Sequence, residues 1–470
     1  MKNGPDVETF DVIVAGAGPS GMAAAKVAAR GGARVLLVDE QASPGGQIFR
    51  RSTVSRDGRV PTLPSYANIV QDVYADASRH GIRYRPMFCA WGVSSDGGIF
   101  VSAEAGTATY RADNLIIATG VSEWVLPVKG WTLPGVTSAG GAQALLKTSN
   151  VLVGRRVAIG GSGPLLLQVA TQLTAAGADV AAVFDATPPA QHVAAAFQVL
   201  RHPPTASLGI KLLGQLRLRN VKIYRGWAIS DIRGAASVTA IRASRVEGDK
   251  SAHIDLDVDA VCLSNGLIPA VELAGLRGCA LTFDGALGVW EVERREGVAT
   301  SVPGVFAVGD GARVGGARKA ILEGQLAGLC ILQRLDRAAA GEFERQRRMI
   351  ERELKALQPI RAYAERTMGY RPAAIAAIDP SVTVCRCEDV QLATVHAAID
   401  EGARSLHELR TRCRIGMGNC QGRICVPTVT RVLSVRANLP LADIPYPRPR
   451  PPIRPMSLRE LAPVTERLPS

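Results

Sequence analysis

The sequence lacks the motifs of several large enzyme classes and has few aromatic residues. Only 5% of the 470 residues are Phe, Trp or Tyr, and no GxSxG, HExxH or P-loop motif is present. No CxxC pair occurs, so the dithiol chemistry of a disulfide reductase has no residues here. The six histidines stand in unrelated settings, and we assign no catalytic residue among them. We therefore expect bound cofactors to carry the chemistry.

Long apolar runs are also missing. No stretch of eighteen apolar residues occurs, and the N-terminus MKNGPDVETF has no apolar segment of a secretory signal. We expect a cytoplasmic protein without a transmembrane segment. Peripheral contact with a respiratory membrane stays open. Nine cysteines in such a chain indicate metal or redox chemistry rather than a disulfide framework.

The formal net charge of +13 is spread along the chain. Basic residues alternate with apolar ones, without a compact basic run or an aromatic stacking pattern. We therefore expect no nucleic-acid binding, and a basic surface that steers an acidic partner or substrate. A length of 470 residues predicts roughly three domains, each large enough for its own core.

The stretch from Asp11 to Glu40 has the pattern of a dinucleotide site. A short apolar run is followed by GxGxxG, an Ala-rich helix and a second apolar run that ends in Asp39–Glu40. In such a unit the pyrophosphate lies on the helix N-terminus and the acid accepts the adenosine ribose. The residues expected to contact the dinucleotide are Gly16, Gly18, Pro19, Ser20, Gly21, Asp39, Glu40 and Gln41.

Three later segments fit the same ligand. SPGGQIFR at 43–50 either wraps the nucleotide, with Gln47 toward it, or is a plain surface turn. NLIIATG ends in Thr119 and Gly120, where small residues let the chain pass close to a ligand. VPGVFAVGD is an apolar strand that ends in Gly309 and Asp310, and its carboxylate is placed to reach the linker of a dinucleotide.

A second nucleotide-type unit begins at Arg156. Gly161 and Gly163 repeat the first two glycines of the pattern, but Leu166 stands at the third position and Asp185 only roughly at the ribose position. We expect a second Rossmann-like fold there. Whether it binds NAD(P), another nucleotide or none stays open.

Five of the nine cysteines lie in the last quarter of the chain. Cys385 and Cys387 form CxC, thirty-two residues follow, and four residues separate Cys420 from Cys425 in the Gly-rich segment GMGNCQGRIC. Two close thiolate pairs match an iron–sulfur site, either [2Fe–2S] or [4Fe–4S], with zinc as the alternative. Cys413 is expected to be a non-ligand, and Cys89, Cys262, Cys279 and Cys330 to be small buried apolar residues.

With these motifs in hand, the chain resembles the two-dinucleotide-domain FAD flavoproteins. VIVAGAGPSG with its acid pair, ATG at 118–120 and VFAVGD at 305–310 match that family's three FAD signatures in order. CRCE and GMGNCQGRIC resemble the [2Fe–2S] domain of bacterioferritin-associated ferredoxin, although that domain usually closes with CxxC. The combination is similar to the large FAD subunit of octopine and nopaline oxidases, hydroxyproline dehydrogenase, hydrogen cyanide synthase and sarcosine oxidase.

The resemblance implies an α/β fold with two Rossmann-like domains, the second inserted in the first, and a small helical iron–sulfur domain. The expected domains are an FAD-binding domain at 1–125 and 281–345, a second Rossmann-like domain at 126–280, a helical connector at 346–379, a cluster domain at 380–435 and a Pro/Arg-rich tail at 436–470. A helix is expected at 67–80, and the tail is expected to be extended, either disordered or lying across a partner subunit.

The resemblance also implies a function. The chain would carry FAD and a [2Fe–2S] cluster held by Cys385, Cys387, Cys420 and Cys425, and would pass on electrons from an FAD-containing beta subunit that oxidises an amino or imino acid. A small ferredoxin-like subunit is a further expected partner. Two alternatives stay open: a stand-alone NAD(P)H-dependent flavin reductase, and a non-catalytic scaffold with vestigial sites.

Overall fold

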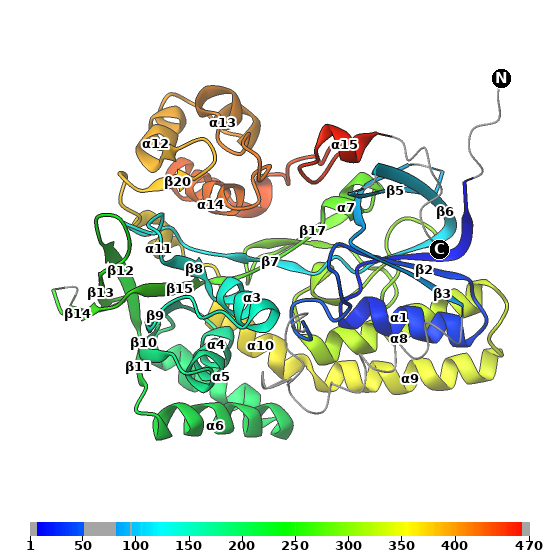
Figure 1. The fold of residues 1–470 in the computed structure, drawn as a ribbon, viewed down its shortest axis with the longest axis horizontal. Helices are drawn as coiled ribbons and strands as arrows, with labels where there is room; N and C mark the ends of the chain where they lie inside the picture. Colours follow the sequence, from blue (N-terminus) through cyan, green and yellow to red (C-terminus); the bar gives the residue numbers. More distant parts are fainter. Residues whose placement is uncertain (1–6, 51–80, 95, 105, 250, 463–470) are drawn as a thin grey trace.

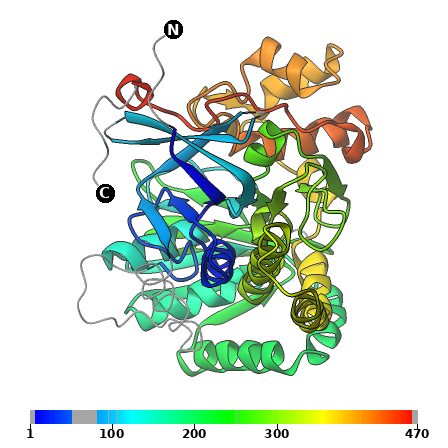
Figure 2. The same cartoon turned by 90° about the vertical axis from the view of Figure 1, so that its right-hand side faces the viewer.

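The computed structural model describes residues 7–50, 81–94, 96–104, 106–249 and 251–462 (Figure 1). The helix expected at 67–80 lies outside these described residues. The chain forms two α/β units and a C-terminal helical unit, and α6 (Pro203–Leu218) lies at the end opposite that helical unit (Figure 1, Figure 2). None of the described helices is long and apolar enough to cross a membrane.

The first unit is built on a seven-stranded sheet of order β3-β2-β1-β6-β5-β4, with β19 also paired to β6. The central strands are parallel and read as continuous apolar runs, because both faces of the sheet are covered. The strands are β1 (Thr9–Ala15), β2 (Val35–Asp39), β3 (Ile82–Pro86), β4 (Cys89–Val93), β5 (Gly98–Ala103), β6 (Gly106–Ile117) and β19 (Val305–Ala307). Strand β6 is longer than the expected segment, since its first half pairs antiparallel with β5 and its second half parallel with β1.

Helices α1 (Pro19–Arg30) and α8 (Ala317–Arg334) pack closely beside this sheet. Two glycines of α8 allow the approach: a Cβ on Gly324 would lie 2.1 Å from the Ser20 carbonyl oxygen, and one on Gly328 would lie 2.6 Å from the Val27 Cβ. The segment that follows β19 is thereby held against the N-terminus of α1.

The second unit is inserted into the first. The chain leaves by β7 (Val121–Trp124) and returns by β16 (Gly266–Pro269), which pair antiparallel. Between them lies a five-stranded parallel sheet of order β11-β10-β9-β15-β8 and a three-stranded antiparallel sheet, β12-β13-β14. Its strands are β8 (Val136–Ser138), β9 (Arg156–Gly161), β10 (Asp179–Asp185), β11 (Lys222–Arg225), β12 (Trp227–Arg233), β13 (Ala240–Arg245), β14 (His253–Asp257) and β15 (Ala260–Ser264).

The remaining elements complete the two units and the connector. Helices α3 (Ala139–Ser149), α4 (Leu165–Ala175), α5 (Pro189–Leu200) and α6 belong to the second unit, whereas α7 (Glu272–Leu276) and the hairpin β17 (Leu281–Asp284)–β18 (Val289–Val292) follow it. The connector holds α9 (Ala340–Ala356), α10 (Gln358–Met368) and α11 (Pro372–Ala376). The boundary expected at residue 345 falls inside α9.

The C-terminal unit contains one small hairpin and three helices. Its elements are β20 (Thr383–Cys385), β21 (Val390–Gln391), α12 (Leu392–Asp400), α13 (Leu406–Cys413) and α14 (Cys425–Ala437). Helix α14 begins at an expected cluster ligand and runs past the boundary expected at residue 435.

The tail packs on its own chain. After the short η2 (Leu441–Asp443) it runs extended to α15 (Leu458–Leu461), at whose start Ser457 and Glu460 cap reciprocally. The Ile453 N–H donates to the Trp91 carbonyl at 3.0 Å, and the Thr107 N–H donates to the Ala462 carbonyl at 2.9 Å. The described part of the tail is therefore ordered against the first unit, which neither expected interpretation included.

Candidate cofactor sites

The glycine loop between β1 and α1 leaves room for a ligand. A Cβ on Gly16 would lie 2.3 Å from the Ala118 carbonyl oxygen, and one on Gly21 would lie 1.8 Å from the Gly16 carbonyl oxygen. Gly18 differs, because a Cβ there would meet only the Gly46 Cα, at 4.0 Å. Gly18 caps α1 without a side-chain hydrogen bond, so the first N–H groups of the helix are free to bind an anion. The loop therefore fits a dinucleotide pyrophosphate.

The two acids at the end of β2 have different environments. Asp39 is buried, and its carboxylate accepts hydrogen bonds from the N–H groups of Ala17 and Gln41. Burial raises the pKa of Asp39. Glu40 is exposed and forms an ion pair with Arg454 of the tail at 3.2 Å. Asp39 therefore holds the glycine loop together, and Glu40 keeps its carboxylate at the surface.

The segment at 43–50 folds over the glycine loop. The Gly45 N–H donates to the Ala17 carbonyl at 2.9 Å, and a Cβ on Gly46 would lie 3.0 Å from the Gly18 Cα. The side chain of Gln47 is exposed. The backbone carbonyls of Gln47 and Ile48 accept hydrogen bonds from the Lys147 ammonium, at 3.2 and 2.9 Å. The second unit thus fixes this loop through one buried lysine.

Thr119 and Gly120 lie between the end of β6 at Ile117 and the start of β7 at Val121. The Thr119 hydroxyl donates to the Ala270 carbonyl at 2.8 Å, and the Ala270 N–H donates to the Gly120 carbonyl at 3.0 Å. Gly120 has a φ of +73°, a conformation that favours glycine. These bonds join the strand that leaves the first unit to the strand that returns to it.

Gly309 and Asp310 lie in the short helix η1 (Gly309–Gly311), beside the start of α1. A Cβ on Gly309 would lie 2.5 Å from the Ser20 hydroxyl oxygen. The Asp310 carboxylate accepts hydrogen bonds from the Gly315 and Gly316 N–H groups, both at 2.8 Å. Burial raises the pKa of Asp310. The Gly-Asp segment therefore lies next to the glycine loop. This proximity is required if both segments contact the same dinucleotide.

A buried ion cluster holds the Gly-Asp segment in place. The Glu323 carboxylate accepts from the Gly309 N–H at 2.8 Å and pairs with Arg294 at 2.6 Å and Lys319 at 2.7 Å. Burial alone would raise the pKa of Glu323, but the two cations hold it below the ordinary value. Sequence reasoning missed Glu323, because a glutamate in a helix has no distinctive local pattern.

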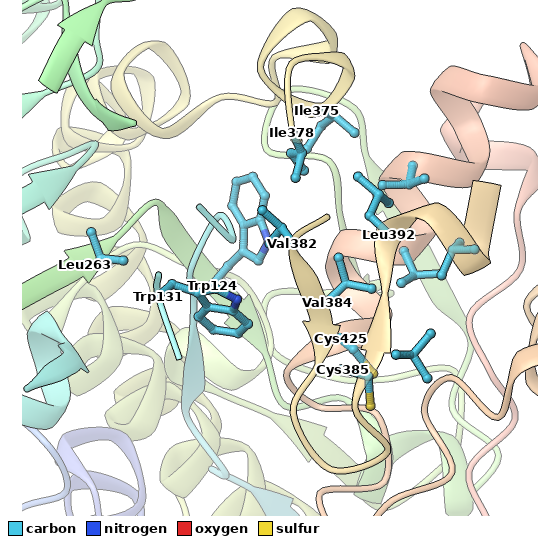
Figure 3. Packing of buried hydrophobic residues seen from close by; sticks show 14 of the residues in the cluster. Trp124, Trp131, Leu263, Ile375, Ile378, Val382, Val384, Cys385, Leu392 and Cys425 are labelled. Carbon is cyan, nitrogen blue, oxygen red and sulfur yellow. The ribbon is translucent and has the colours of Figure 1, made fainter. Parts of the chain in front are cut away.

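The four predicted cysteine ligands lie together. The thiols of Cys385 and Cys425 are neighbours, as are those of Cys387 and Cys420, and Figure 3 shows the first pair side by side. A Cβ on Gly418 would lie 2.2 Å from the Cys387 Cβ, so the Gly-rich loop approaches the thiols closely. The soft thiolate set and the close backbone fit an iron–sulfur cluster.

The other cysteines stand apart from this site. Cys413 is buried and its thiol donates to the Leu409 carbonyl at 3.0 Å. Cys262 and Cys279 are buried as expected, whereas Cys89 and Cys330 are half-buried. Among the residues that the structure describes, no three His, Cys, Asp or Glu side chains converge on one point as ligands of a single metal ion.

Helix α14 joins the cluster site to the junction of the two α/β units. The Trp124 indole N–H donates to the Thr428 hydroxyl at 3.0 Å, and the buried Arg431 guanidinium lies 4.2 Å from the centroid of the Trp124 ring. A second contact lies nearby, where the Trp131 indole N–H donates to the Thr383 carbonyl at 2.7 Å. Figure 3 shows both tryptophans in the same apolar cluster as Cys385. The C-terminal unit is therefore docked on the two α/β units by buried contacts.

The connector covers the glycine turn of the second unit. A Cβ on Gly163 would lie 2.5 Å from the Met368 Cγ, and Leu166 is buried in the core where a third glycine would stand. The Thr187 hydroxyl donates to the Thr367 carbonyl at 3.1 Å. The Arg371 guanidinium donates to the Ala186 carbonyl. These connector residues lie over the carboxyl ends of β9 and β10, where a dinucleotide would bind in this fold.

Comparison with known proteins agrees with both sites. Residues 10–324 match the model of the pyridine nucleotide-disulphide oxidoreductase family, and residues 383–434 match a BFD-like [2Fe–2S] binding domain. An opine oxidase subunit of Rhizobium meliloti is 34% identical over 97% of this chain and 99% of its own. A hydrogen cyanide synthase subunit of Pseudomonas aeruginosa, HcnB, is 30% identical over 94% of this chain and 96% of its own.

A solved structure shares the fold. L-proline dehydrogenase from P. horikoshii superposes with a TM-score of 0.70, at 19% identity, over 98% of this chain and 81% of that chain. The protein is an FAD-dependent oxidoreductase with an iron–sulfur domain. The chain belongs to the pyridine nucleotide-disulphide oxidoreductase family, in the group that includes this opine oxidase subunit. Its cofactors are FAD and a [2Fe–2S] cluster, which settles the choice against zinc and [4Fe–4S].

Proposed function

We propose that this chain is the electron-transfer subunit of a heteromeric dehydrogenase or oxidase that acts on the CH–NH bond of an opine, hydroxyproline or a related secondary amine. A separate FAD-containing beta subunit removes two electrons and two protons from the amine to give the imine. A small ferredoxin-like subunit is a further partner, and the complex is cytoplasmic. Support comes from relatives whose names state a subunit of opine oxidase and of hydrogen cyanide synthase.

One observation carries the proposal: both cofactor sites lie in one chain and are joined by buried contacts. Strand β7 starts directly after Thr119–Gly120 and ends at Trp124, which bonds to the helix that begins at Cys425. FAD takes up electrons in pairs and a [2Fe–2S] cluster passes them singly. We assign the oxidation of the amine to the partner, because the relatives are named as subunits of larger enzymes.

We assign the following roles to the site residues as part of this proposal. Gly16, Gly18 and Ser20 face the pyrophosphate, and Asp310 faces the ribityl chain. Glu40 is the ribose acceptor, because both Asp39 carboxylate oxygens already accept backbone N–H groups. The thiolates of Cys385, Cys387, Cys420 and Cys425 hold the cluster. The glycines exclude side chains, and Lys147 fixes the covering loop.

The stand-alone NAD(P)H reductase is disfavoured by the connector. Met368 lies against Gly163, and Arg371 bonds to the carbonyl just after β10, so a dinucleotide would have to displace both. We infer that electrons enter from the partner subunit rather than from NAD(P)H.

Isolation of the chain with its natural partners tests the proposal. The complex should contain flavin and iron, and an opine, hydroxyproline or N-methyl amino acid should bleach the flavin and reduce the cluster only when the partner is present. EPR of the isolated chain after reduction with dithionite should show one [2Fe–2S] signal. A colourless chain without flavin or iron, or reduction of the isolated chain by an amine, would contradict the proposal.

A further inference from the structure

Helices α5 and α6 expose an unusual amount of apolar surface. Thirteen large apolar side chains are exposed among the described residues, and five of them lie on these two consecutive helices. Phe197 is 66% exposed and Leu218 is 86% exposed. The five residues are Val193, Phe197, Leu200, Ile210 and Leu218. Only Ala195 of α5 and Leu216 of α6 are buried, so both helices turn most of their surface outward.

The exposed apolar residues are ordered along each helix. Val193, Phe197 and Leu200 follow the i, i+4, i+7 spacing that places side chains on one face. On α6, Ile210 and Leu218 are eight residues apart and share a face in the same way. The apolar stripe of α5 is therefore continuous, whereas that of α6 is interrupted by Gly214 and Arg217. Apolar residues gathered on an exposed face mark an interaction site.

The charges around the stripes have one sign. Residues 186–230 contain six basic residues and no Asp or Glu. All six are exposed: Arg201, Lys211, Arg217, Arg219, Lys222 and Arg225. Lys211 directly follows Ile210, and Arg217 directly precedes Leu218. Because residues seven apart share a face of a helix, Arg217 lies on the side of Ile210 and Lys211 on the side of Leu218, so basic and apolar side chains are mixed on α6.

The apolar stripes and their basic neighbours indicate which partner binds this face of α5 and α6. A second copy of the chain would bring six positive charges against six positive charges, so self-pairing on this face is opposed. Helices with an apolar stripe and a border of Lys and Arg bind in the plane of an anionic membrane surface. The α5–α6 pair also lies at the end of the molecule opposite the cluster unit, so a bilayer there would leave the cluster unit uncovered (Figure 1).

We propose that the outward face of α5 and α6 is a docking surface for an anionic lipid bilayer. The apolar stripes enter the boundary between head groups and acyl chains, and the basic residues of α6 and of the segments that follow the two helices meet the lipid phosphates. This inference adds a location to the proposed function, and its test does not depend on amine oxidation.

Vesicle co-sedimentation of the full chain with its cofactors tests the surface. The protein should sediment with vesicles of phosphatidylcholine and phosphatidylglycerol, but not with phosphatidylcholine alone, and 0.5 M salt should release most of it, since electrostatic attraction is screened to about 4 Å at such salt. F197S/L200S and K211Q/R217Q should each weaken binding at least tenfold. Met349→Ser, an exposed apolar residue on α9, is the matched control and should bind like the wild type.

Three results would overturn the proposal: no binding of the wild type to anionic vesicles, equal binding to neutral vesicles, or equal loss in the control. If the α5–α6 variants instead lose a co-purified subunit while vesicles never bind, the surface contacts a protein. Flavin content, iron content and partner-dependent reduction should be unchanged in all variants. Loss of those properties in the wild type would count against the proposed function and not against the lipid surface.

Discussion

The guanidinium of Arg431 lies 4.2 Å from the centre of the Trp124 ring, in the core between the cluster unit and the two α/β units. It donates to the Pro427 carbonyl at 2.7 Å and to the Gly288 carbonyl at 2.9 Å. Burial lowers the pKa of Arg431 to about 10. A cation held by a ring and two carbonyls is a costly group to bury, and it fixes the position of α14.

Arg431→Met should therefore loosen the docking of the cluster unit. The Gly288 carbonyl loses its guanidinium donor and the Trp124 ring loses its cation, so we expect a loss of about 2–4 kcal/mol in the free energy of unfolding, together with slower reduction of the cluster by the flavin. Denaturant titration and stopped-flow absorbance measure the two effects. Arg436→Gln, which removes an exposed ion pair with Asp400 on the same helix, should cost less than about 1 kcal/mol. Equal effects of both variants would refute the role of Arg431.

Serine substitution of any of Cys385, Cys387, Cys420 and Cys425 should remove most of the iron and the visible cluster absorption. The cause is loss of one thiolate from a four-thiolate site. Cys413→Ser is the matched control, because its thiol donates to a backbone carbonyl and should not matter for iron content. Iron analysis and EPR of the reduced protein decide. Iron loss in the Cys413 variant alone would reassign the ligands.

The glycine loop permits a test that separates fold from ligand. Gly21→Ala should fail to fold, because its Cβ would lie 1.8 Å from a backbone oxygen. Gly18→Ala should fold, since its φ is −70° and the nearest atom would be at 4.0 Å, yet it should bind FAD at least tenfold more weakly. Circular dichroism and flavin fluorescence after gel filtration measure the two properties. Full flavin retention in Gly18→Ala would show that the FAD pyrophosphate does not bind at this loop.

The buried Lys147 side chain should make the free energy of unfolding depend on pH. Burial, with a smaller contribution from Arg50, lowers the pKa of Lys147 from 10.5 to about 8. The unfolded chain then binds more protons than the folded chain between pH 8 and 10.5, so the free energy of unfolding should rise over this range, by up to about 3 kcal/mol. Lys147→Met should abolish this rise and also weaken FAD retention, because the loop at 43–50 loses its anchor.

The control for this measurement is Lys129→Met, a lysine outside the loop contact. It should leave the rise with pH and the flavin content unchanged. Urea titrations at pH 8, 9 and 10 compare the three proteins. A rise that persists in Lys147→Met would assign the titration to another group.

NADH and NADPH should not reduce the flavin of the isolated chain under anaerobic conditions. Met368 and Arg371 lie where the dinucleotide would bind in the second unit. Stopped-flow absorbance of the flavin is the measurement, and dithionite serves as the positive control for both cofactors. Bleaching within seconds by either nucleotide would favour the stand-alone reductase.

The sequence predicted the parts of the site that depend on local patterns. The glycine loop, the acid pair, the Gly-Asp turn and the four cysteines were all recognisable, because each needs particular residues at short spacing. The residues that hold these parts together were not. Lys147 acts on a carbonyl 100 positions away, and Arg431 on one 143 positions away. A basic residue among mostly apolar helix residues was the only signal for either one.

The pair Asp39 and Glu40 also combines a local pattern, which the sequence reveals, with long-range contacts, which it does not. The sequence placed Asp39 and Glu40 at the ribose position but could not separate them. The distinction arises from the Ala17 N–H, which the turn directs at Asp39, and from Arg454, which the tail brings to Glu40. Tertiary contacts that span the chain decide which carboxylate stays available.

The tail has a consequence for the kinetics of the relay. The Pro452 carbonyl accepts from the Gln421 side chain beside Cys420, the Ile453 N–H bonds to β4, and Arg454 pairs with Glu40. The connector joins the N-terminal end of the cluster unit to the first α/β unit, and the tail joins its C-terminal end to the same unit. The cluster unit is therefore held at both ends and has no free hinge among the described residues. Electron tunnelling between the cofactors should therefore take place across a constant gap, at a rate that is independent of solvent viscosity.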